Sequence, residues 1–260
     1  MDLDPARATY DAFAPIYNEF NYQNDYEMWL GEVLLPELEK HGLKRGRALD
    51  VGCGTGRAFR PLLRRGWEVR ACDLSPGMLE RAREEGGDQV QLDVVDMREL
   101  PAYGEFELVL SLNDAVNYLL DDADLERALA RMRANLAADG LLLFDVNSKG
   151  TYDSGSWSGG SHVVEHDGRS WTWQGIGEVE GQPSVFETRI EGDDIEPIVH
   201  RERFRPEAEV RKAMSAAGLD CLAALGMQEI GEKVVLSDPP DEGRDYKVVY
   251  IGARASRRSS

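Results

Sequence analysis

Short apolar runs alternate with amphipathic segments along most of this chain. The runs lie near residues 47–52, 67–73, 89–94, 106–112 and 140–146, and each has the length of a buried strand. The segments between them carry apolar residues at helical spacing, as in Asp124 to Ala138, a helix that we expect Gly140 to end. Strands that alternate with helices predict an α/β fold, in which a mostly parallel, doubly wound sheet has helices on both faces.

The segments on either side of this alternation have other patterns. In residues 1–46, the apolar side chains at helical spacing are Tyr26, Trp29, Leu30, Val33 and Leu34, so this segment predicts an N-terminal helical cap. Residues 150–204 are rich in glycine, serine and tryptophan and contain patches of period-two alternation. That pattern predicts an inserted set of antiparallel strands.

The alternation resumes after the insertion. Pro206 to Ala217 predicts a helix, and Asp220–Met227 and Lys247–Ala253 predict two closing strands, which makes seven in the main sheet. The predicted organisation is a cap (1–46), a core (47–149), an antiparallel insertion (150–204), a completion of the core (205–255) and a disordered tail (256–260).

The charge balance narrows the choice of partners. The chain of 260 residues has 48 acidic and 30 basic residues, a formal net charge of −18. Such a field repels phosphate backbones and anionic membranes and favours cationic or amine-bearing partners, so we expect neither a nucleic-acid nor a membrane partner. The three cysteines, Cys53, Cys72 and Cys221, lack metal-ligand spacing, and we interpret them as reduced thiols of a cytoplasmic protein without a metal site. We identify no signal peptide and no membrane-spanning stretch.

The turn after the first predicted strand carries the clearest chemical signal. Ala48-Leu-Asp-Val-Gly-Cys-Gly-Thr-Gly56 leads from a strand into a helix, and its glycines let a ligand approach the backbone closely. Arg57 occupies the position where a dinucleotide fingerprint needs its third glycine. The carboxylate of Asp50, just before the glycines, suits a cationic ligand better than a pyrophosphate.

These residues resemble the first motif of class I S-adenosylmethionine (SAM)-dependent methyltransferases, which have a Rossmann-like fold. The resemblance implies that Asp50 lies near the methionine amino group of the cofactor, and that Gly52 to Gly56 pass beneath its methionine part. Asp73, roughly 20 positions further on at the end of a strand, is placed to accept hydrogen bonds from ribose hydroxyls. Ser75 and Pro76 then begin a helix as N-cap and first helical residue.

The resemblance also implies contacts for the adenine. An acidic residue at the position of Asp96 accepts the adenine amino group in this family, and the amide of the next residue, Met97, binds a ring nitrogen. Leu74 and Met78 are expected against the adenine face, although helix core is an equal alternative for Met78. The full set expected along the cofactor is Tyr17, Tyr26, Asp50, Gly52, Cys53, Gly54, Gly56, Asp73, Leu74, Met78, Asp96, Met97 and Leu112.

A closer likeness is to small bacterial enzymes that methylate natural products and sugar amines. It rests on Tyr10-Asp-Ala-Phe-Ala-Pro-Ile-Tyr17, Asn24-Asp-Tyr26 and Leu112-Asn-Asp-Ala-Val-Asn-Tyr118. In such enzymes N-terminal tyrosines close over the cofactor, which makes Tyr17 and Tyr26 candidates, and an insertion like residues 150–204 covers the substrate. Its tryptophans, Trp157, Trp171 and Trp173, either contact a ring-bearing substrate or fasten the insertion to the core.

Methyl transfer from a sulfonium needs alignment and exclusion of water, and a hydroxyl acceptor also needs a general base. The candidates for the transfer site are Tyr17 together with His200 or Asn113, and Asp114 is placed as well as Asn113 to orient an acceptor. For His200 we favour a solvated strand position over one that faces the pocket. Metal-assisted O-methylation through Asp145 and Asn147 is the less favoured alternative.

The sequence therefore predicts a SAM-dependent methyltransferase that acts on a nitrogen or oxygen of a small-molecule acceptor. The segment after Leu112 lacks the Asn-Pro-Pro-Tyr pattern of many base-methylating enzymes, which argues against a nucleic-acid base as acceptor. The alternatives are a tRNA or protein methyltransferase, a catalytically silent SAM-binding partner subunit and a dinucleotide oxidoreductase. Whether the chain forms a homodimer is left open.

Overall fold

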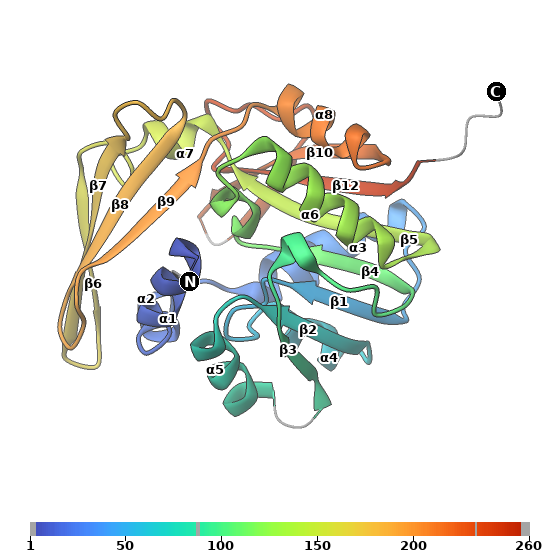
Figure 1. Ribbon diagram of the computed structural model, residues 1–260, viewed down its shortest axis with the longest axis horizontal. Helices are drawn as coiled ribbons and strands as arrows, with labels where there is room; N and C mark the ends of the chain where they lie inside the picture. The colour runs from blue at the N-terminus through green and yellow to red at the C-terminus, as the bar shows by residue number, and fades with distance from the viewer. Residues whose placement is uncertain (1–3, 87–88, 232, 256–260) are drawn as a thin grey trace.

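A computed structural model describes residues 4–86, 89–231 and 233–255 as two sheets surrounded by helices (Figure 1). In these ranges the larger sheet consists of β1 (Arg47–Val51), β2 (Glu68–Asp73), β3 (Gln91–Val94), β4 (Phe106–Ser111), β5 (Leu136–Asn147), β10 (Leu219–Ile230), β11 (Lys233–Ser237) and β12 (Lys247–Arg254). Its order is β11-β10-β12-β5-β4-β1-β2-β3. The five strands from β5 to β3 are parallel, and the three others join antiparallel. The predicted α/β fold with a mostly parallel sheet is confirmed, with eight strands in place of seven.

Helices cover both faces of this sheet because its buried strands have apolar side chains on both sides. In β4, Leu108 and Leu110 belong to one apolar core, and Val109 belongs to the core on the opposite face. The helices are α1 (Pro5–Phe13), α2 (Tyr17–Phe20), η1 (Glu27–Leu34), α3 (Leu35–Lys40), α4 (Phe59–Arg64), α5 (Pro76–Gly86), η3 (Met97–Glu99), η4 (Ala115–Tyr118), α6 (Asp122–Ala134), α7 (Lys149–Asp153) and α8 (Glu207–Ala216). The predicted N-terminal cap is thus helical, and η1 within it is a π-helix.

The boundary between α6 and β5 differs from the prediction. The buried C-cap Asn135 ends the helix, where its side chain accepts a hydrogen bond from the Tyr103 amide and donates to the Pro101 carbonyl. Leu136 then pairs with Phe106 as the first residue of β5. Gly140 does not end the helix. It lies within β5, where a Cβ would come within 2.5 Å of the Phe106 carbonyl oxygen.

The unpredicted eighth strand is β11, which forms an antiparallel hairpin with β10. The turn contains Gly231 at a positive φ of 64°, which glycine adopts without steric cost. The hairpin extends the sheet at its outer edge, far from the carboxyl ends of β1 and β2.

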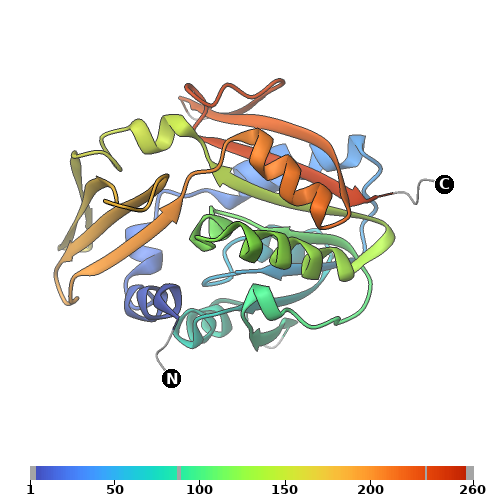
Figure 2. The ribbon, with the colours of Figure 1, turned by 45° about the horizontal axis from the view of Figure 1, so that its top comes forward.

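The insertion forms a separate antiparallel sheet, as predicted for this segment. Its strands are β6 (Ser161–His166), β7 (Arg169–Glu178), β8 (Val185–Gly192) and β9 (Ile198–Arg203). Helices α1 and α2 lie between this sheet and the parallel strands in both ribbon views (Figures 1 and 2). Phe13, Phe20, Trp171 and Ile198 form an apolar cluster at this contact. The sheet and the N-terminal helices thus wall one side of the molecule.

Helices of the described ranges lack the combination of length and apolar character that a bilayer crossing requires. The tail predicted for residues 256–260 lies outside the described residues.

Candidate functional site

The sheet reverses its strand order beside β1. β2 and β3 extend it on one side of β1, and β4 and β5 extend it on the other. Loops at the carboxyl ends of the strands separate at such a point, which is where open α/β sheets bind ligands. A cleft of about 860 Å³ opens there, and residues that follow β1, β2, β3 and β4 line it. We call it the cofactor cleft.

The glycine turn forms the floor of the cofactor cleft. Gly52, Gly54 and Gly56 have φ values of 74°, 54° and 83°. A Cβ built on Gly54 would meet no atom within 4 Å, so the backbone there faces open space. A ligand can therefore lie directly on this turn.

Asp50 lies beneath this turn and is 1% exposed. Neither of its carboxylate oxygens has a hydrogen-bond partner among the described residues. Burial, and to a smaller extent the charge of Asp73, raises the pKa of Asp50 to about 8. A buried carboxyl group without donors is costly, so the position favours a cationic ligand that supplies them.

Asp73 lines the same cleft and fixes the turn around it. Its carboxylate accepts the amide of Gly54 at 2.8 Å and the amide of Ser75 at 2.9 Å. Ser75 accepts the amide of Met78, which confirms its predicted role as N-cap of α5. Each Asp73 oxygen keeps a lone pair, so the expected contact with ribose hydroxyls stays a prediction that this geometry permits.

Asp96 also lines the cleft, but Arg98 holds both of its oxygens. The guanidinium donates to them at 2.9 and 3.0 Å and reaches Asp124 at 3.0 Å. Although burial opposes the shift, these hydrogen bonds lower the pKa of Asp96. The predicted adenine contact would therefore have to share a carboxylate that is already bound.

The other predicted cofactor residues divide into two groups. Those that line the cleft are Tyr17, Tyr26, Cys53, Leu74, Met97 and Leu112. Met78 is fully buried in the apolar cluster around Phe13 and Trp171, the core position that its sequence pattern left open. Gly56 lies at the end of the turn, where its amide donates to the Cys53 carbonyl.

A second chamber of about 620 Å³ adjoins the cofactor cleft. The two share Tyr10, Tyr17, Asn113 and Tyr118 in their walls. The remaining walls come from α1, the segment after α2, the loop after β4, the carboxyl end of β5, α7 with the segment after it, and the antiparallel sheet: Phe13, Asn21, Asn24, Asp114, Asn147, Thr151, Trp157, Trp173, His200 and Glu202. We call it the acceptor chamber. Trp157 and Trp173 thus lie where a ring-bearing ligand would contact them, whereas Trp171 packs in the cluster beneath the N-terminal helices.

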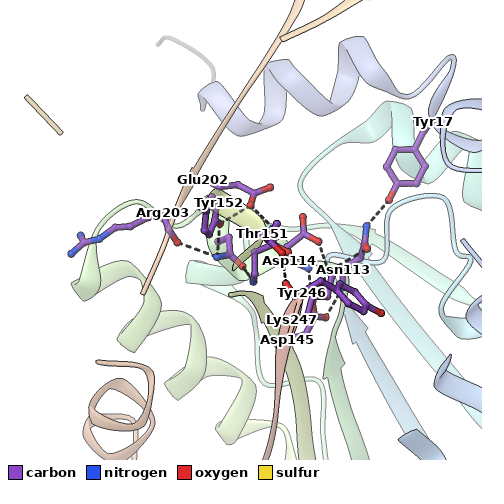
Figure 3. Close-up of polar contacts among 12 residues, drawn as sticks. Tyr17, Asn113, Asp114, Asp145, Thr151, Tyr152, Glu202, Arg203, Tyr246 and Lys247 are labelled. Atoms are coloured by element: carbon purple, nitrogen blue, oxygen red, sulfur yellow. Dashed lines mark hydrogen bonds and ion pairs between the residues drawn. The ribbon is translucent and has the colours of Figure 1, made fainter. Parts of the chain in front are cut away.

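Tyr17 stands at the junction of the two spaces. Its hydroxyl accepts a hydrogen bond from the Asn113 side-chain amide at 3.5 Å, as Figure 3 shows. Burial is the main cause that raises the pKa of Tyr17, so its hydroxyl keeps its proton. Tyr17 and Asn113, two of the three residues predicted for the transfer site, are thus in contact, and the third, His200, lines the same chamber.

The favoured prediction for His200 was wrong. The residue is 1% exposed and lines the acceptor chamber, because its position on β9 points toward Phe13 and Trp173 and away from solvent. Its Nδ1 forms a hydrogen bond of 2.7 Å with the Tyr118 hydroxyl, while Nε2 has no partner among the described residues. Burial lowers the pKa of His200 to about 4, so the ring is neutral at neutral pH.

A buried ion network fixes the loop after β4. Asn113 and Asp114 both have left-handed backbones, with φ of 62° and 59°. Asp145 on β5 accepts their amides at 2.6 and 2.9 Å, and Lys247 on β12 binds Asp145 at 2.7 Å and also contacts Asp114 (Figure 3). Although burial disfavours its charge, the two aspartates raise the pKa of Lys247 above its ordinary value. The network therefore holds two strained residues at the chamber wall.

Sequence reasoning missed Lys247 and Glu202. Glu202 is 1% exposed, and its Oε2 accepts hydrogen bonds of 2.8 Å from both Tyr152 and Asn147. It lies two positions after His200 on the same face of β9, so period-two alternation offered a signal for it. Lys247 pairs with Asn147 across two strands that lie far apart in the sequence, which no local pattern reveals.

Comparisons with known proteins agree with this geometry. Residues 48–140 match the family described as a methyltransferase domain. This segment of the chain, from β1 to the middle of β5, is thus similar to a methyltransferase domain. A Geobacillus sp. protein named as a methyltransferase is 36% identical over 145 residues, which are 54% of this chain and 58% of that protein. A Streptomyces fradiae dTDP-3-amino-3,6-dideoxy-α-D-glucopyranose N,N-dimethyltransferase is 29% identical over 193 residues, 70% of this chain and 73% of that enzyme.

The fold agrees over nearly the whole chain. A crystal structure of a SAM-dependent methyltransferase from Clostridium acetobutylicum superposes with a TM-score of 0.75 at 22% identity, and covers 95% of this chain and 99% of that one. The chain spans somewhat over half the length of the first curated relatives that it matches. The activity of the whole chain is therefore a proposal.

SAM is the cofactor of this family, and the residues of the cofactor cleft fit it. The amino group at the methionine end of SAM is cationic and can donate hydrogen bonds. The carboxyl group of Asp50 is buried and has no hydrogen-bond donor among the described residues, so this amino group would complete it. The open space above Gly54 accommodates a ligand where a side chain would fill it. Asp50, Asp73 and the turn between them are therefore the residues that would hold it.

Proposed function

We propose that this protein transfers a methyl group from SAM to a nitrogen of a small-molecule amine in the acceptor chamber. The observation that carries this proposal is the composition of the chamber wall. It combines the carboxyl groups of Asp114 and Glu202 with aromatic rings, and its lining contains no lysine or arginine among the described residues. Such a wall attracts cations and disfavours anions.

When bound, SAM supplies a methyl group on a sulfonium, which an acceptor takes by direct displacement. The protein's own part is to position the acceptor and to exclude water. Tyr17 and Asn113 belong to the walls of both spaces, so they stand where acceptor and methyl group would meet. The nearly complete burial of His200 and Glu202 supports a chamber shielded from water.

The acid–base groups favour nitrogen over oxygen as the acceptor atom. A hydroxyl acceptor needs a general base whose pKa lies near the working pH. His200, with a pKa of about 4, is a weak base, and Asp114 is already paired with Lys247. An amine needs only to lose the proton of its ammonium form, which is far more acidic than a hydroxyl. The Streptomyces fradiae relative, named for an amino sugar, supports the same class of acceptor.

The proposal is tested in two steps. Calorimetric titration with S-adenosylhomocysteine, for the native protein and for Asp73→Ala, should show binding that the substitution weakens. Incubation with SAM and matched small amines and phenols, followed by mass spectrometry, should then show one added methyl group on amines. Methylation confined to phenols would assign oxygen, and no binding of S-adenosylhomocysteine would reject the activity.

A further inference from the structure

Glu202 and Asp114 both line the acceptor chamber, and the charge of Asp114 adds to burial in raising the pKa of Glu202. Two neighbouring carboxylates repel each other when both are ionised, which favours one proton held by the pair. Both donors to Glu202, Tyr152 and Asn147, converge on its Oε2. These two donors leave Oε1 as the oxygen of Glu202 that is able to hold a proton.

The charges around this pair do not balance. Asp145 and Glu202 are buried carboxyl groups and Asp114 is a partly buried one, and Lys247 is the one cation in contact with this cluster among the described residues. With Glu202 protonated the cluster still has one negative charge in excess. Burial, together with the charge of Asp114, raises the pKa of Glu202 well above its ordinary value. A second cation would relieve this excess.

The groups that surround the pair are otherwise neutral. The tyrosines are Tyr10 and Tyr17 from the N-terminal helices, Tyr118 from η4 and Tyr152 from α7, and burial raises the pKa of each. His200 from β9 is the remaining titratable neighbour, and burial lowers its pKa to about 4. Lys247 thus provides the cluster's single positive charge, and Asp145 shares it with Asp114.

An independent feature indicates that a ligand belongs here. The His200 Nε2 atom is buried and has no hydrogen-bond partner in the described part of the chain, although its ring lines the chamber. His200 and Glu202 lie two residues apart on β9 and share a face of the strand. An amine could pair with this nitrogen and with the carboxyl groups together, because its ammonium form donates N–H bonds and its neutral form also accepts one through the lone pair.

We propose that Asp114 and Glu202 form an ammonium-binding subsite, in which a cationic amine replaces the proton that the two carboxyl groups share. The inference rests on the proposed function and adds its recognition chemistry. Before binding, the pair holds one proton and the free ammonium holds its own. The complex retains one of these two, shared between nitrogen and carboxyl, and releases the other to solvent. When the retained proton lies on Glu202, the amine is neutral and its lone pair is free to form the new N–C bond.

Binding measurements test this subsite without turnover. The protein is first saturated with S-adenosylhomocysteine and then titrated with benzylamine, benzyltrimethylammonium or benzyl alcohol as probes. We expect both cations to bind at least about tenfold more tightly than the alcohol, because a positive charge is attracted by the carboxyl groups and by the aromatic rings of the wall. Calorimetry in phosphate and in Tris at one pH should show release of about one proton with either cation.

Variants locate the effect. Glu202→Gln preserves side-chain size, and we expect it to abolish proton release and weaken cation binding about tenfold. Glu187→Gln is the matched control, since Glu187 lies on the neighbouring strand paired with Arg201 and away from the chamber. If Glu202→Gln does not fold, Asp114→Asn serves in its place.

The outcomes separate the two proposals. Equal binding of alcohol and cations, or cation binding without proton release, overturns the ammonium subsite while S-adenosylhomocysteine binding leaves the methyltransferase proposal intact. Failure of the native protein to bind S-adenosylhomocysteine rejects the methyltransferase proposal, and cation binding to the same protein still decides whether the subsite exists.

Discussion

Asp50 couples cofactor binding to pH through a single buried carboxyl group. Its pKa of about 8 in the folded protein means that it is mostly protonated at neutral pH, whereas an ammonium ligand requires the carboxylate. Affinity should therefore rise with pH by up to about tenfold per unit below about pH 8 and level off above it. Titration with S-adenosylhomocysteine at about pH 6, 7 and 8 measures this. A flat profile would contradict the role given to Asp50.

The same residue should limit the stability of the ligand-free protein. Its folded-state pKa lies above the ordinary value of 3.8, so this group's contribution to stability decreases as pH rises from that value to about 8. Asp50→Asn removes the buried acid and should raise the free energy of unfolding at pH 8 by about 1–3 kcal/mol while weakening cofactor binding. Denaturant unfolding measures the gain, with Asp139→Asn, at an exposed position of β5, as control.

Lys247 should matter more for structure than its absence from any motif suggests. Lys247→Met leaves the buried Asp145 and the partly buried Asp114 without their cation. We expect a loss of about 3–5 kcal/mol in the free energy of unfolding, the usual effect of breaking a buried pair. Lys212→Met on the exposed face of α8 provides the comparison in urea unfolding. Equal stability of the two variants would show that the network does not hold the loop.

Residues at strand ends were predictable, and those of the acceptor chamber only in part. Asp50 and Asp73 lie at the carboxyl ends of β1 and β2, which are parallel neighbours, so sequence alone located them at one edge of the sheet. The burial of His200 depends on packing against α1 and Trp173, which are distant in the sequence. The alternation of residues along β9 shows that the strand has two faces. It does not show whether the face with His200 contacts a chamber or solvent.

Among the elements, the turn between β1 and α4 should accept a side chain at Gly54 with little loss of folding stability but with a loss of ligand affinity. Gly54→Ala meets no atom within 4 Å, so its cost should be the backbone strain of about 1–2 kcal/mol at positive φ. The new methyl group would project toward the ligand and should weaken S-adenosylhomocysteine binding about tenfold or more. Gly42→Ala has the same open surroundings and a φ of 90° in a turn after α3, and should show the strain alone. Similar affinities for both variants would place the ligand elsewhere.

The differences between predicted and observed elements arise where tertiary contacts decide. Leu136 continues the apolar spacing of α6, and only the buried hydrogen bonds of Asn135 make it the start of β5. The segment of β11 is a short apolar run after a glycine turn. Pairing with β10 is what makes this segment a strand. Local pattern identified the alternation of the core, whereas element ends depended on neighbours.

At the scale of the whole molecule, the two spaces are closed by the segment that lies between the sheets. Asp11 binds Ser75 at the start of α5, and Asn18 binds Thr55 in the glycine turn, so α1 and α2 are attached to the loops that line the cofactor cleft. Tyr10 and Tyr17 from the same helices line both spaces. A ligand in the cleft should therefore stabilise these helices more than the central strands, which are already buried.

Hydrogen–deuterium exchange with and without S-adenosylhomocysteine tests this coupling. We expect exchange in residues 5–24 to slow by about tenfold or more on binding, while amides of β4 and β5 change little. The reason is that opening of α1 and α2 breaks contacts with the ligand in the cleft, whereas exchange from the central strands requires unfolding of the core. In the Asp73→Ala variant, at a ligand concentration that leaves its cleft unfilled, the protection of residues 5–24 should disappear. Protection spread evenly over both sheets would instead mean that the ligand stabilises the fold as one unit and that the N-terminal helices do not act as its cover.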